Sequence, residues 1–344
     1  MQSLLDAFPE NLTSWLAEQA QPAFRGSQIQ RWLFQGRADS FDQMSDLPAN
    51  LRDRLQEQFQ IWSTDIALHQ QSADGTEKLL LRLADGQTIE CVLLRDGQRR
   101  TICISSQVGC AMGCVFCASG LDGVKRNLTS GEILEQMLKL QRLLAPGERL
   151  SHIVVMGMGE PLANLDRLLP ALDWAHRRDG LGISARRITI STVGLPPALD
   201  RLSRLEIPYH LAVSLHAPND DLRNQLVPVN RGIGIAAILA AADRYFQVSG
   251  RRLTFEYVLL GQVNDQVDHA RQLAALLRGQ NALLNVIPYN PVAGLPYETP
   301  SAADQRAFCA VLTRAGIQVQ IRERKGDEID AACGQLRRKQ LIGS

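Results

Sequence analysis

The stretch Cys103–Gly120, CISSQVGCAMGCVFCASG, holds four of the chain's seven cysteines. Three of them, Cys110, Cys114 and Cys117, have the spacing C-x3-C-x2-C, and Cys103 lies seven residues before the first. A structural zinc site takes four ligands, usually as two separated pairs, and a ferredoxin needs a fourth thiolate for each cluster. The other cysteines are scattered along the chain and supply neither a second ligand pair for zinc nor a fourth thiolate for a ferredoxin cluster. Three thiolates on a four-iron cluster leave one iron open to chelate a substrate.

The composition is that of an ordinary soluble enzyme, with 45% hydrophobic and 21% charged residues, and the net charge of +1 points neither toward nor away from nucleic acid. The N-terminal sequence lacks the basic start and apolar run of a signal peptide, and no segment approaches the ~20 apolar residues of a membrane helix. We therefore expect a cytoplasmic protein without a membrane anchor. In that compartment clustered cysteines act as metal ligands or redox groups.

Two segments precede the cysteine loop. Within residues 1–60, apolar residues such as Ile29 and Leu33 recur at helical spacing, and a further helix is expected to start at Ser45 or Asp46. This segment has no catalytic constellation, so we expect a helical accessory domain that either caps the protein or binds a partner. Between 76 and 105, three β-rich runs separated by Asp-Gly pairs predict a meander leading into the cysteine loop.

The rest of the chain alternates between strand and helix patterns. Amphipathic helical stretches, such as 130–144 and 301–315, separate apolar runs that suit buried parallel strands. This alternation predicts an α/β protein with a parallel sheet and helices outside it. Polar segments containing Gly or Pro follow strand after strand, as at the active-site rim of a (β/α) barrel. The apolar runs are 152–156, 187–191, 210–215, 253–260, 283–287 and 317–321.

The cysteine spacing, with Phe116 just before the last cysteine, resembles the signature of radical S-adenosylmethionine (SAM) enzymes. In that superfamily the methionine part of SAM binds the open iron of a [4Fe-4S] cluster, and reductive cleavage gives a 5′-deoxyadenosyl radical. The segment GMGEP offers a flexible turn at Gly159 for close backbone approach, and Glu160 as an acceptor for the SAM ammonium group. Ser191, Ser214, His216 and Asn290 are hydrogen-bonding side chains at further strand ends.

Seven stretches together resemble the RlmN-like adenosine-C2 RNA methyltransferases, with the Cfr-type C8 methyltransferases as relatives. The resemblance extends from the helical N-terminal region to Leu336, and it is specific because the cysteine loop and the AACGQL element occur together. The stretches are CISSQVGCAMGCVFCASG, KRNLTSGEI, VVMGMGEPLAN, ITISTVGLPPAL, LAVSLHAPNDDLRNQLVPVN, NVIPYNP and GDEIDAACGQL.

This resemblance implies a partial (β/α)6 TIM-like radical SAM barrel with an N-terminal helical accessory domain and a β-hairpin extension. The corresponding units are residues 1–60 (accessory domain), 61–100 (β-meander), 101–322 (barrel) and 323–344 (catalytic-cysteine loop and tail). The implied reaction is methylation of C2 of an adenine in 23S rRNA and, in many members, of the adenine 3′ to the tRNA anticodon. Methylation at C8 stays open as the alternative. The implied partners are RNA and an external electron donor such as flavodoxin, and we expect a monomer.

The resemblance also assigns roles to residues. A [4Fe-4S] cluster would be bound by the three loop cysteines, Cys333 would carry the methyl group, Cys103 would resolve its adduct, and Glu90 would be the base. Taken alone, Glu90 would be a solvent-facing strand residue and Cys333 a buried free thiol. SAM would be held by Gly159, Glu160, Ser191, Ser214, Leu215, His216 and Asn290.

The implied route accounts for the two additional cysteines. C2 of adenine is electron-poor, so it does not attack the methyl group of a sulfonium directly. In the family's route Cys333 first takes a methyl group from one SAM, and the radical from a second SAM removes a hydrogen from that S-methyl group. The methylene radical adds to C2. After one-electron oxidation and loss of the C2 proton, attack by Cys103 on the Cys333 sulfur forms a disulfide and releases the product.

Other classes explain the sequence less well. A methylthiotransferase needs a second three-cysteine cluster, which the four remaining cysteines do not provide. A glycyl-radical activase acts on a protein and has no use for the pair Cys103 and Cys333. An RNA-binding module without catalysis would explain none of the cysteines.

Overall fold

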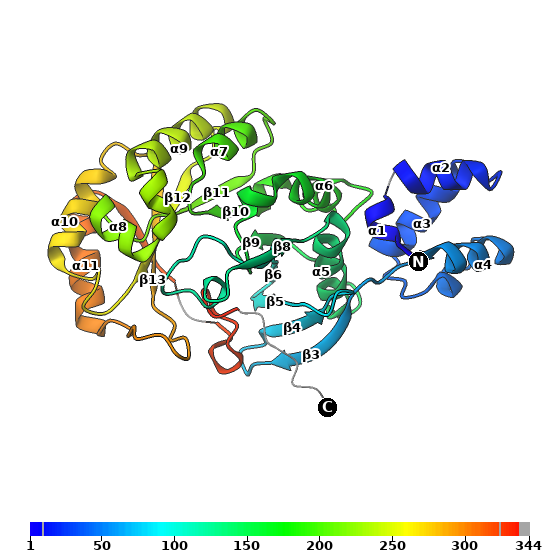
Figure 1. The fold of residues 1–344 in the computed structure, drawn as a ribbon, viewed down its shortest axis with the longest axis horizontal. Coiled ribbons are helices and arrows are strands. Elements are labelled where there is room, and N and C mark those ends of the chain that lie inside the picture. Colours follow the sequence, from blue (N-terminus) through cyan, green and yellow to red (C-terminus); the bar gives the residue numbers. More distant parts are fainter. Residues whose placement is uncertain (9, 323–324, 337–344) are drawn as a thin grey trace.

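A ten-stranded sheet runs through the protein in the computed structural model, which describes residues 1–8, 10–322 and 325–336 (Figure 1). Its strands in chain order are β3 (Asp65–Gln71), β4 (Glu77–Arg82), β5 (Thr88–Asp96), β6 (Arg99–Cys103), β9 (His152–Val155), β10 (Ile188–Thr192), β11 (His210–Ser214), β12 (Leu253–Leu259), β13 (Ala282–Pro288) and β14 (Gln318–Ile321). Their order in the sheet is β14-β13-β12-β11-β10-β9-β6-β5-β4-β3.

Parallel and antiparallel parts of this sheet meet at β6. The strands from β6 to β14 are parallel neighbours, whereas β3, β4, β5 and β6 pair antiparallel as a meander. The sheet is open, with β14 at one end and β3 at the other. The predicted partial barrel is therefore confirmed, and the meander continues the barrel sheet through β6.

Helices connect the parallel strands and cover the outer face of the sheet (Figure 1). On that face Ile102, Ile153 and Ile188 lie side by side in register and are fully buried, which accounts for the apolar runs in the sequence. None of the described helices has the length and hydropathy needed to cross a membrane. The connecting helices are α5 (Ser130–Arg142), α6 (Leu165–His176), α7 (Pro196–Ser203), α8 (Asp220–Leu226), α9 (Ile235–Ser249), α10 (Val267–Leu276) and α11 (Ala302–Arg314).

The N-terminal segment is helical as predicted, with α1 (Leu4–Ala7), α2 (Glu10–Glu18), α3 (Phe24–Phe34) and α4 (Ala49–Gln58). A short parallel pair, β1 (Gln2–Ser3) and β2 (Phe59–Gln60), joins its two ends. The expected helix start at Ser45 or Asp46 is wrong, because α4 begins only after Pro48. Asp46 instead accepts a hydrogen bond from Trp32 Nε1 at 2.6 Å, which ties its loop to α3.

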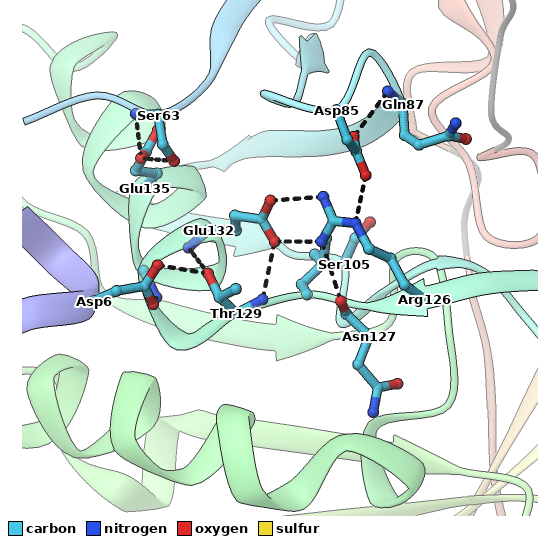
Figure 2. A network of polar contacts seen from close by, with 12 residues as sticks. Asp6, Ser63, Asp85, Gln87, Ser105, Arg126, Asn127, Thr129, Glu132 and Glu135 are labelled. Atoms are coloured by element: carbon cyan, nitrogen blue, oxygen red, sulfur yellow. Dashed lines mark hydrogen bonds and ion pairs between the residues drawn. The ribbon is translucent and has the colours of Figure 1, made fainter. Parts of the chain in front are cut away.

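Buried and capping carboxylates fix this domain to the barrel (Figure 2). Asp6 of α1 accepts hydrogen bonds from Thr129 Oγ1 at 2.9 Å and from the Gly131 amide at 2.6 Å, at the start of α5. The fully buried Glu135 of α5 accepts a hydrogen bond from the Ser63 amide at 2.6 Å, in the segment between α4 and β3. The helical domain and the meander therefore both dock on α5.

The same region anchors the far end of the cysteine loop (Figure 2). After the loop, β8 (Val124–Asn127) pairs back with β7 (Gln107–Gly109). Arg126 of β8 donates two hydrogen bonds of 2.8 Å to Glu132 of α5, and one of 2.6 Å to Asp85 in the meander turn. Gly109 has φ +79°, and a Cβ there would lie 2.0 Å from the Gly123 carbonyl oxygen, so this position requires glycine.

Candidate active site

The carboxyl ends of the parallel strands surround a cavity of about 840 Å³ including its mouth, a size typical of ligand sites. It collects residues from the cysteine loop, from the segments that follow the strands and from the C-terminal segment. The candidate site residues that line it are Cys110, Cys114, Cys117, Gly159, Glu160, Ser191, Ser214, His216 and Cys333. These residues gather at the carboxyl ends of the strands, where the sequence predicts an active-site rim.

Strand register decides which side chains face this cavity. Cys103 lies opposite Val154, and Val154 lies opposite Thr189, two residues before Ser191. Further along the sheet Ser214 lies opposite Glu256. Side chains two residues apart in a strand, or opposite one another in neighbouring strands, share a face. Cys103, Ser191, Ser214 and Glu256 therefore all project from the inner face of the barrel.

Glu90 also belongs to this inner face, although taken alone it reads as solvent-facing. Its neighbour two residues on, Val92, lies opposite Cys103. The Glu90 side chain is only 1% exposed and forms an ion pair with Lys78. The solvent-facing interpretation is wrong because both faces of β5 are covered, one by helices and the other by the C-terminal segment. The carboxylate lies beside the cavity and not in its lining.

The three loop cysteines fit a cluster that binds each thiolate to a different iron. All three line the cavity, and burial raises the pKa of each thiol, to about 12 for Cys110. For Cys114 the neighbouring Cys117 and Cys110 raise the pKa further, because three negative charges would gather there. Such a donor set needs cationic metal to hold it deprotonated.

A single ion does not fit this set. Across residues 1–8, 10–322 and 325–336, no three His, Cys, Asp or Glu side chains converge as ligands of one metal ion. A cubane does not require such convergence, because each of its ligands binds its own iron. A zinc ion would need a tetrahedral arrangement around one point.

Glu160 has a structural role alongside the predicted contact with SAM. Its side chain is buried and accepts hydrogen bonds of 2.9 Å from the Leu162 and Val193 amides, one on each oxygen. Burial raises the pKa of this carboxyl group, and the two amides act in the opposite direction. The Thr192 side chain is a further hydrogen-bond partner of this carboxylate. At Gly159, φ is +101° and a Cβ would lie 2.6 Å from Cβ of Gln107, so the turn requires glycine.

The serines predicted to bind SAM surround a buried carboxylate that the sequence did not single out. Ser191 Oγ lies 3.4 Å from Ser214 Oγ and donates to Glu256 Oε2 at 3.3 Å. Among the described residues, Asn290 Oδ1 is a buried oxygen without a hydrogen-bond partner, whereas Glu256 Oε1 lies 3.6 Å from Arg322 Nη1. A ligand with hydroxyl or ammonium groups, such as SAM, would give Asn290 Oδ1 a donor.

His216 is held neutral at the cavity wall. Its Nδ1 accepts a hydrogen bond of 3.0 Å from the Val258 amide, so the proton sits on Nε2. Burial lowers the pKa of its imidazole to about 3, with a further contribution from Arg223. The ring packs edge-on against Phe116 of the cysteine loop, with ring centroids 4.9 Å apart. His216 therefore joins the strand ends to the cluster loop.

Two of the predicted SAM contacts are not among the residues that line the cavity. Leu215 is fully buried, and its carbonyl oxygen accepts a 2.9 Å hydrogen bond from Arg223 Nε. Asn290 donates from Nδ2 to the Cys333 carbonyl oxygen at 3.0 Å. In this structure the Asn290 amide group thus positions the loop that carries Cys333.

Cys333 lies at the exposed mouth of the cavity, in a segment docked against the cluster loop. The Ala118 amide donates to the Gly334 carbonyl oxygen at 2.8 Å. Burial raises the pKa of the Cys103 thiol to about 12, and the neighbouring Cys333 adds to that shift. The structure thus brings the two cysteines, 230 residues apart in the chain, into one region. Of the predicted unit 323–344, residues 323–324 and 337–344 lie outside the described residues.

Arg322, directly after β14, brings a positive charge to this region. Its Nη1 lies 3.6 Å from Glu256 Oε1. Loss of solvation against the cavity wall raises the pKa of the Cys333 thiol, Arg322 lowers it, and Glu256 and Cys117 raise it again. Arg322 therefore favours the thiolate form of Cys333, the form that accepts a methyl group.

Replacing Arg322 with alanine is expected to move the pH profile of Cys333 alkylation to higher pH, because the cation that lowers the pKa of the thiol is lost. The thiolate fraction rises with pH up to the thiol pKa, so loss of the cation slows alkylation at every pH below it. Iodoacetamide labelling of the Cys333 peptide, followed by mass spectrometry, measures this. Arg322→Lys keeps the charge and should retain most of the wild-type profile. Equal profiles for Arg322→Ala and wild type would contradict the assignment.

Sequence reasoning missed Glu256, Arg322 and Lys78. Each carried a weak signal, since Glu256 and Lys78 are charges inside apolar strand runs and Arg322 directly follows the last strand. A charge in an apolar run indicates either an edge position or a polar interior. Only the register of the sheet distinguishes these alternatives.

Comparison with known proteins identifies the family. Residues 104–274 match the radical SAM superfamily, and residues 2–61 match the ribosomal RNA large subunit methyltransferase N-terminal domain. A probable dual-specificity RNA methyltransferase RlmN from Rhodopirellula baltica is 68% identical, over 97% of this chain and 90% of that protein. The chain belongs to the RlmN family of radical SAM RNA methyltransferases.

Two further relatives span nearly the whole chain. A probable dual-specificity RNA methyltransferase RlmN from Carboxydothermus hydrogenoformans is 44% identical, over 98% of this chain and 99% of that protein. The crystal structure of a radical SAM methyltransferase from Sphaerobacter thermophilus superposes with a TM-score of 0.95 at 43% identity, covering 98% of this chain and 99% of that one. The predicted family and fold are confirmed.

Proposed function

We propose that this RlmN-family enzyme methylates C2 of an adenine in 23S rRNA and of the adenine 3′ to the anticodon in tRNA. The observation that carries the proposal is the convergence of three groups on one barrel interior. Glu90 and Cys103 project from its inner face, and Cys333 lines the cavity shared with the cluster cysteines. The two relatives compared above are named as probable dual-specificity RNA methyltransferases, which supports two classes of RNA substrate.

Cys110, Cys114 and Cys117 would hold a [4Fe-4S] cluster. SAM would lie against Gly159–Glu160, Ser191, Ser214–His216 and Asn290, with Glu256 as a further neighbour. When bound, the cluster and SAM supply a 5′-deoxyadenosyl radical by one-electron reduction. The fixed loop ends at Gly109 and Arg126 keep the three thiols in place for this chemistry.

The chain's own groups would carry the methyl transfer. The Cys333 thiolate attacks the methyl group of SAM, forming a thioether while the bond from methyl carbon to sulfonium sulfur breaks. Arg322 assists by favouring that thiolate. Later, Glu90 takes the C2 proton of the adduct, and the Cys103 thiolate attacks the Cys333 sulfur. The new S–S bond would form as the bond from the Cys333 sulfur to the methylene carbon breaks, and that carbon would take up a proton to complete the methyl group on C2.

The remaining assignments follow from this reaction. Residues 1–60 would position RNA, 61–100 would extend the sheet, 101–322 would form the catalytic barrel, and 323–344 would present Cys333. A cytoplasmic location, a monomeric state and an external electron donor such as flavodoxin agree with this scheme. The Cys103–Cys333 disulfide would have to be reduced after each turnover.

Nucleoside mass spectrometry tests the proposal. Adenosines from 23S rRNA and tRNA of cells with and without this gene are compared, and both RNAs are expected to lose 2-methyladenosine when the gene is deleted. Loss of 8-methyladenosine instead would contradict the C2 assignment. Unchanged tRNA would restrict the enzyme to rRNA.

A further inference from the structure

A buried ion pair lies on the inner face of the meander. Lys78 Nζ is 3.1 Å from Glu90 Oε1, and each side chain is only 1% exposed. Removing two charges from water costs several kcal/mol for each ion, and buried pairs are often replaceable by apolar residues without loss of stability. A completely buried lysine is also rare. A contribution to the stability of the fold is therefore a weak explanation for the burial of these two charges.

The Lys78 ammonium makes a second contact. It donates to the Asp330 carbonyl oxygen at 3.1 Å, three residues before Cys333. The Lys78 ammonium thus contacts both Glu90, the proposed base, and the segment that contains Cys333, the proposed methyl carrier. This segment passes alongside β4 (Figure 1).

Lys78 also lies in register with the resolving cysteine. It is directly opposite Val92 of β5, and Val92 is directly opposite Cys103 of β6. Lys78 and Cys103 therefore stand in one row across the inner face, two strand spacings or about 10 Å apart. Lys78, Glu90 and Cys103 form the floor beneath the Asp330–Cys333 segment.

The C-terminal segment meets this floor and the cluster loop at separate points. At its start the Gly326 amide donates to Asp74 Oδ2 at 2.9 Å in the meander. Near its end Ser119 Oγ donates to the Leu336 carbonyl oxygen at 2.5 Å in the cluster loop. The Lys78 contact lies between these two anchors, three residues before Cys333, whose own carbonyl oxygen accepts a hydrogen bond from Asn290. It is therefore placed to set the position of Cys333 over Cys103.

We propose that Lys78 is a positioning residue of the reaction, whose ammonium orients the Glu90 carboxylate and seats the Asp330 end of the Cys333 segment over Cys103. The inference rests on the proposed roles of Glu90, Cys103 and Cys333. The inference adds one requirement to that mechanism. Proton removal by Glu90 and attack by Cys103 both depend on Lys78, although its side chain contacts neither the Cys103 sulfur nor the Cys333 sulfur.

The test compares Lys78→Met, Lys78→Arg and wild-type holoenzyme. Arg82→Met is the matched control, since Arg82 lies on the same strand in an exposed ion pair with Asp65. Lys78→Met should still form methyl-Cys333, seen by mass spectrometry of the peptide, because methyl transfer involves neither Glu90 nor Cys103. In a single turnover with RNA it should accumulate a covalent protein–RNA adduct and release product at least tenfold more slowly. Lys78→Arg should recover most of the release rate.

A second measurement does not depend on turnover. Labelling of Cys333 by N-ethylmaleimide should be several-fold faster in Lys78→Met, because the segment loses its central anchor. The double variant Lys78→Met/Glu90→Met removes both buried charges, which favours folding, and should show the same faster labelling. Labelling and product release equal to those of Arg82→Met would overturn the role of Lys78. If wild type itself forms neither methyl-Cys333 nor an adduct, the proposed function fails instead.

Discussion

Replacing Cys103 with alanine is expected to trap the enzyme on its RNA. Methyl transfer to Cys333 should continue, because the Cys333 thiolate and its Arg322 neighbour are untouched. Release should stop, because nothing is left to attack the thioether sulfur, and product formation should fall by at least about 1,000-fold. Denaturing gel electrophoresis with labelled RNA would show the adduct as a slowly migrating band.

Two controls separate this result from general damage. Cys91→Ala removes a buried thiol on the outer face of the neighbouring strand and should leave turnover near the wild-type rate. Cys333→Ala should form no adduct at all, because the methyl carrier is gone. Normal turnover of Cys103→Ala without trapped RNA would disprove the two-cysteine mechanism for this protein.

Replacing Cys117 with alanine is expected to abolish SAM cleavage. The two remaining thiols of the loop cannot hold a four-iron cluster, so anaerobic reconstitution should fall well below the wild-type content of about four irons and four sulfides. Iron analysis and the yield of 5′-deoxyadenosine after reduction measure both effects. Cys110→Ala and Cys114→Ala should behave in the same way.

Cys309→Ala is the matched control for the cluster variants, because Cys309 lies on α11 on the outside of the barrel. It should bind iron and cleave SAM like wild type. A wild-type protein that takes up stoichiometric zinc, and no iron on reconstitution, would contradict the cluster assignment. Full SAM cleavage by Cys117→Ala would contradict it as well.

Much of this architecture could be predicted from sequence because its signals are local. Buried parallel strands appear as uninterrupted apolar runs, and the Asp-Gly pairs of the meander mark turns that few other dipeptides allow. The loop cysteines are close in the chain, so their spacing alone indicates shared chemistry. These parts of the prediction did not depend on long-range contacts.

The inner face of the barrel could not be predicted in the same way. Whether Glu90 faces solvent or the interior depends on what covers β5, and that cover comes from residues more than 200 positions later in the chain. The pair of Glu256 and Arg322 likewise joins two strands through register. The late start of α4 reflects a tertiary hydrogen bond from Trp32 to Asp46, which competes with helix capping.

Transfer of a deuterated methyl group tests the central claim most directly. Purified enzyme is incubated with RNA and with SAM that carries three deuterium atoms on its methyl group, and the mass of the methylated adenosine is measured by mass spectrometry. Because the S-methyl group on Cys333 loses one hydrogen isotope before its carbon bonds to C2, the product should be 2-methyladenosine that keeps two of the three deuterium atoms. A product that keeps all three would show direct displacement onto the base and would contradict the route through Cys333.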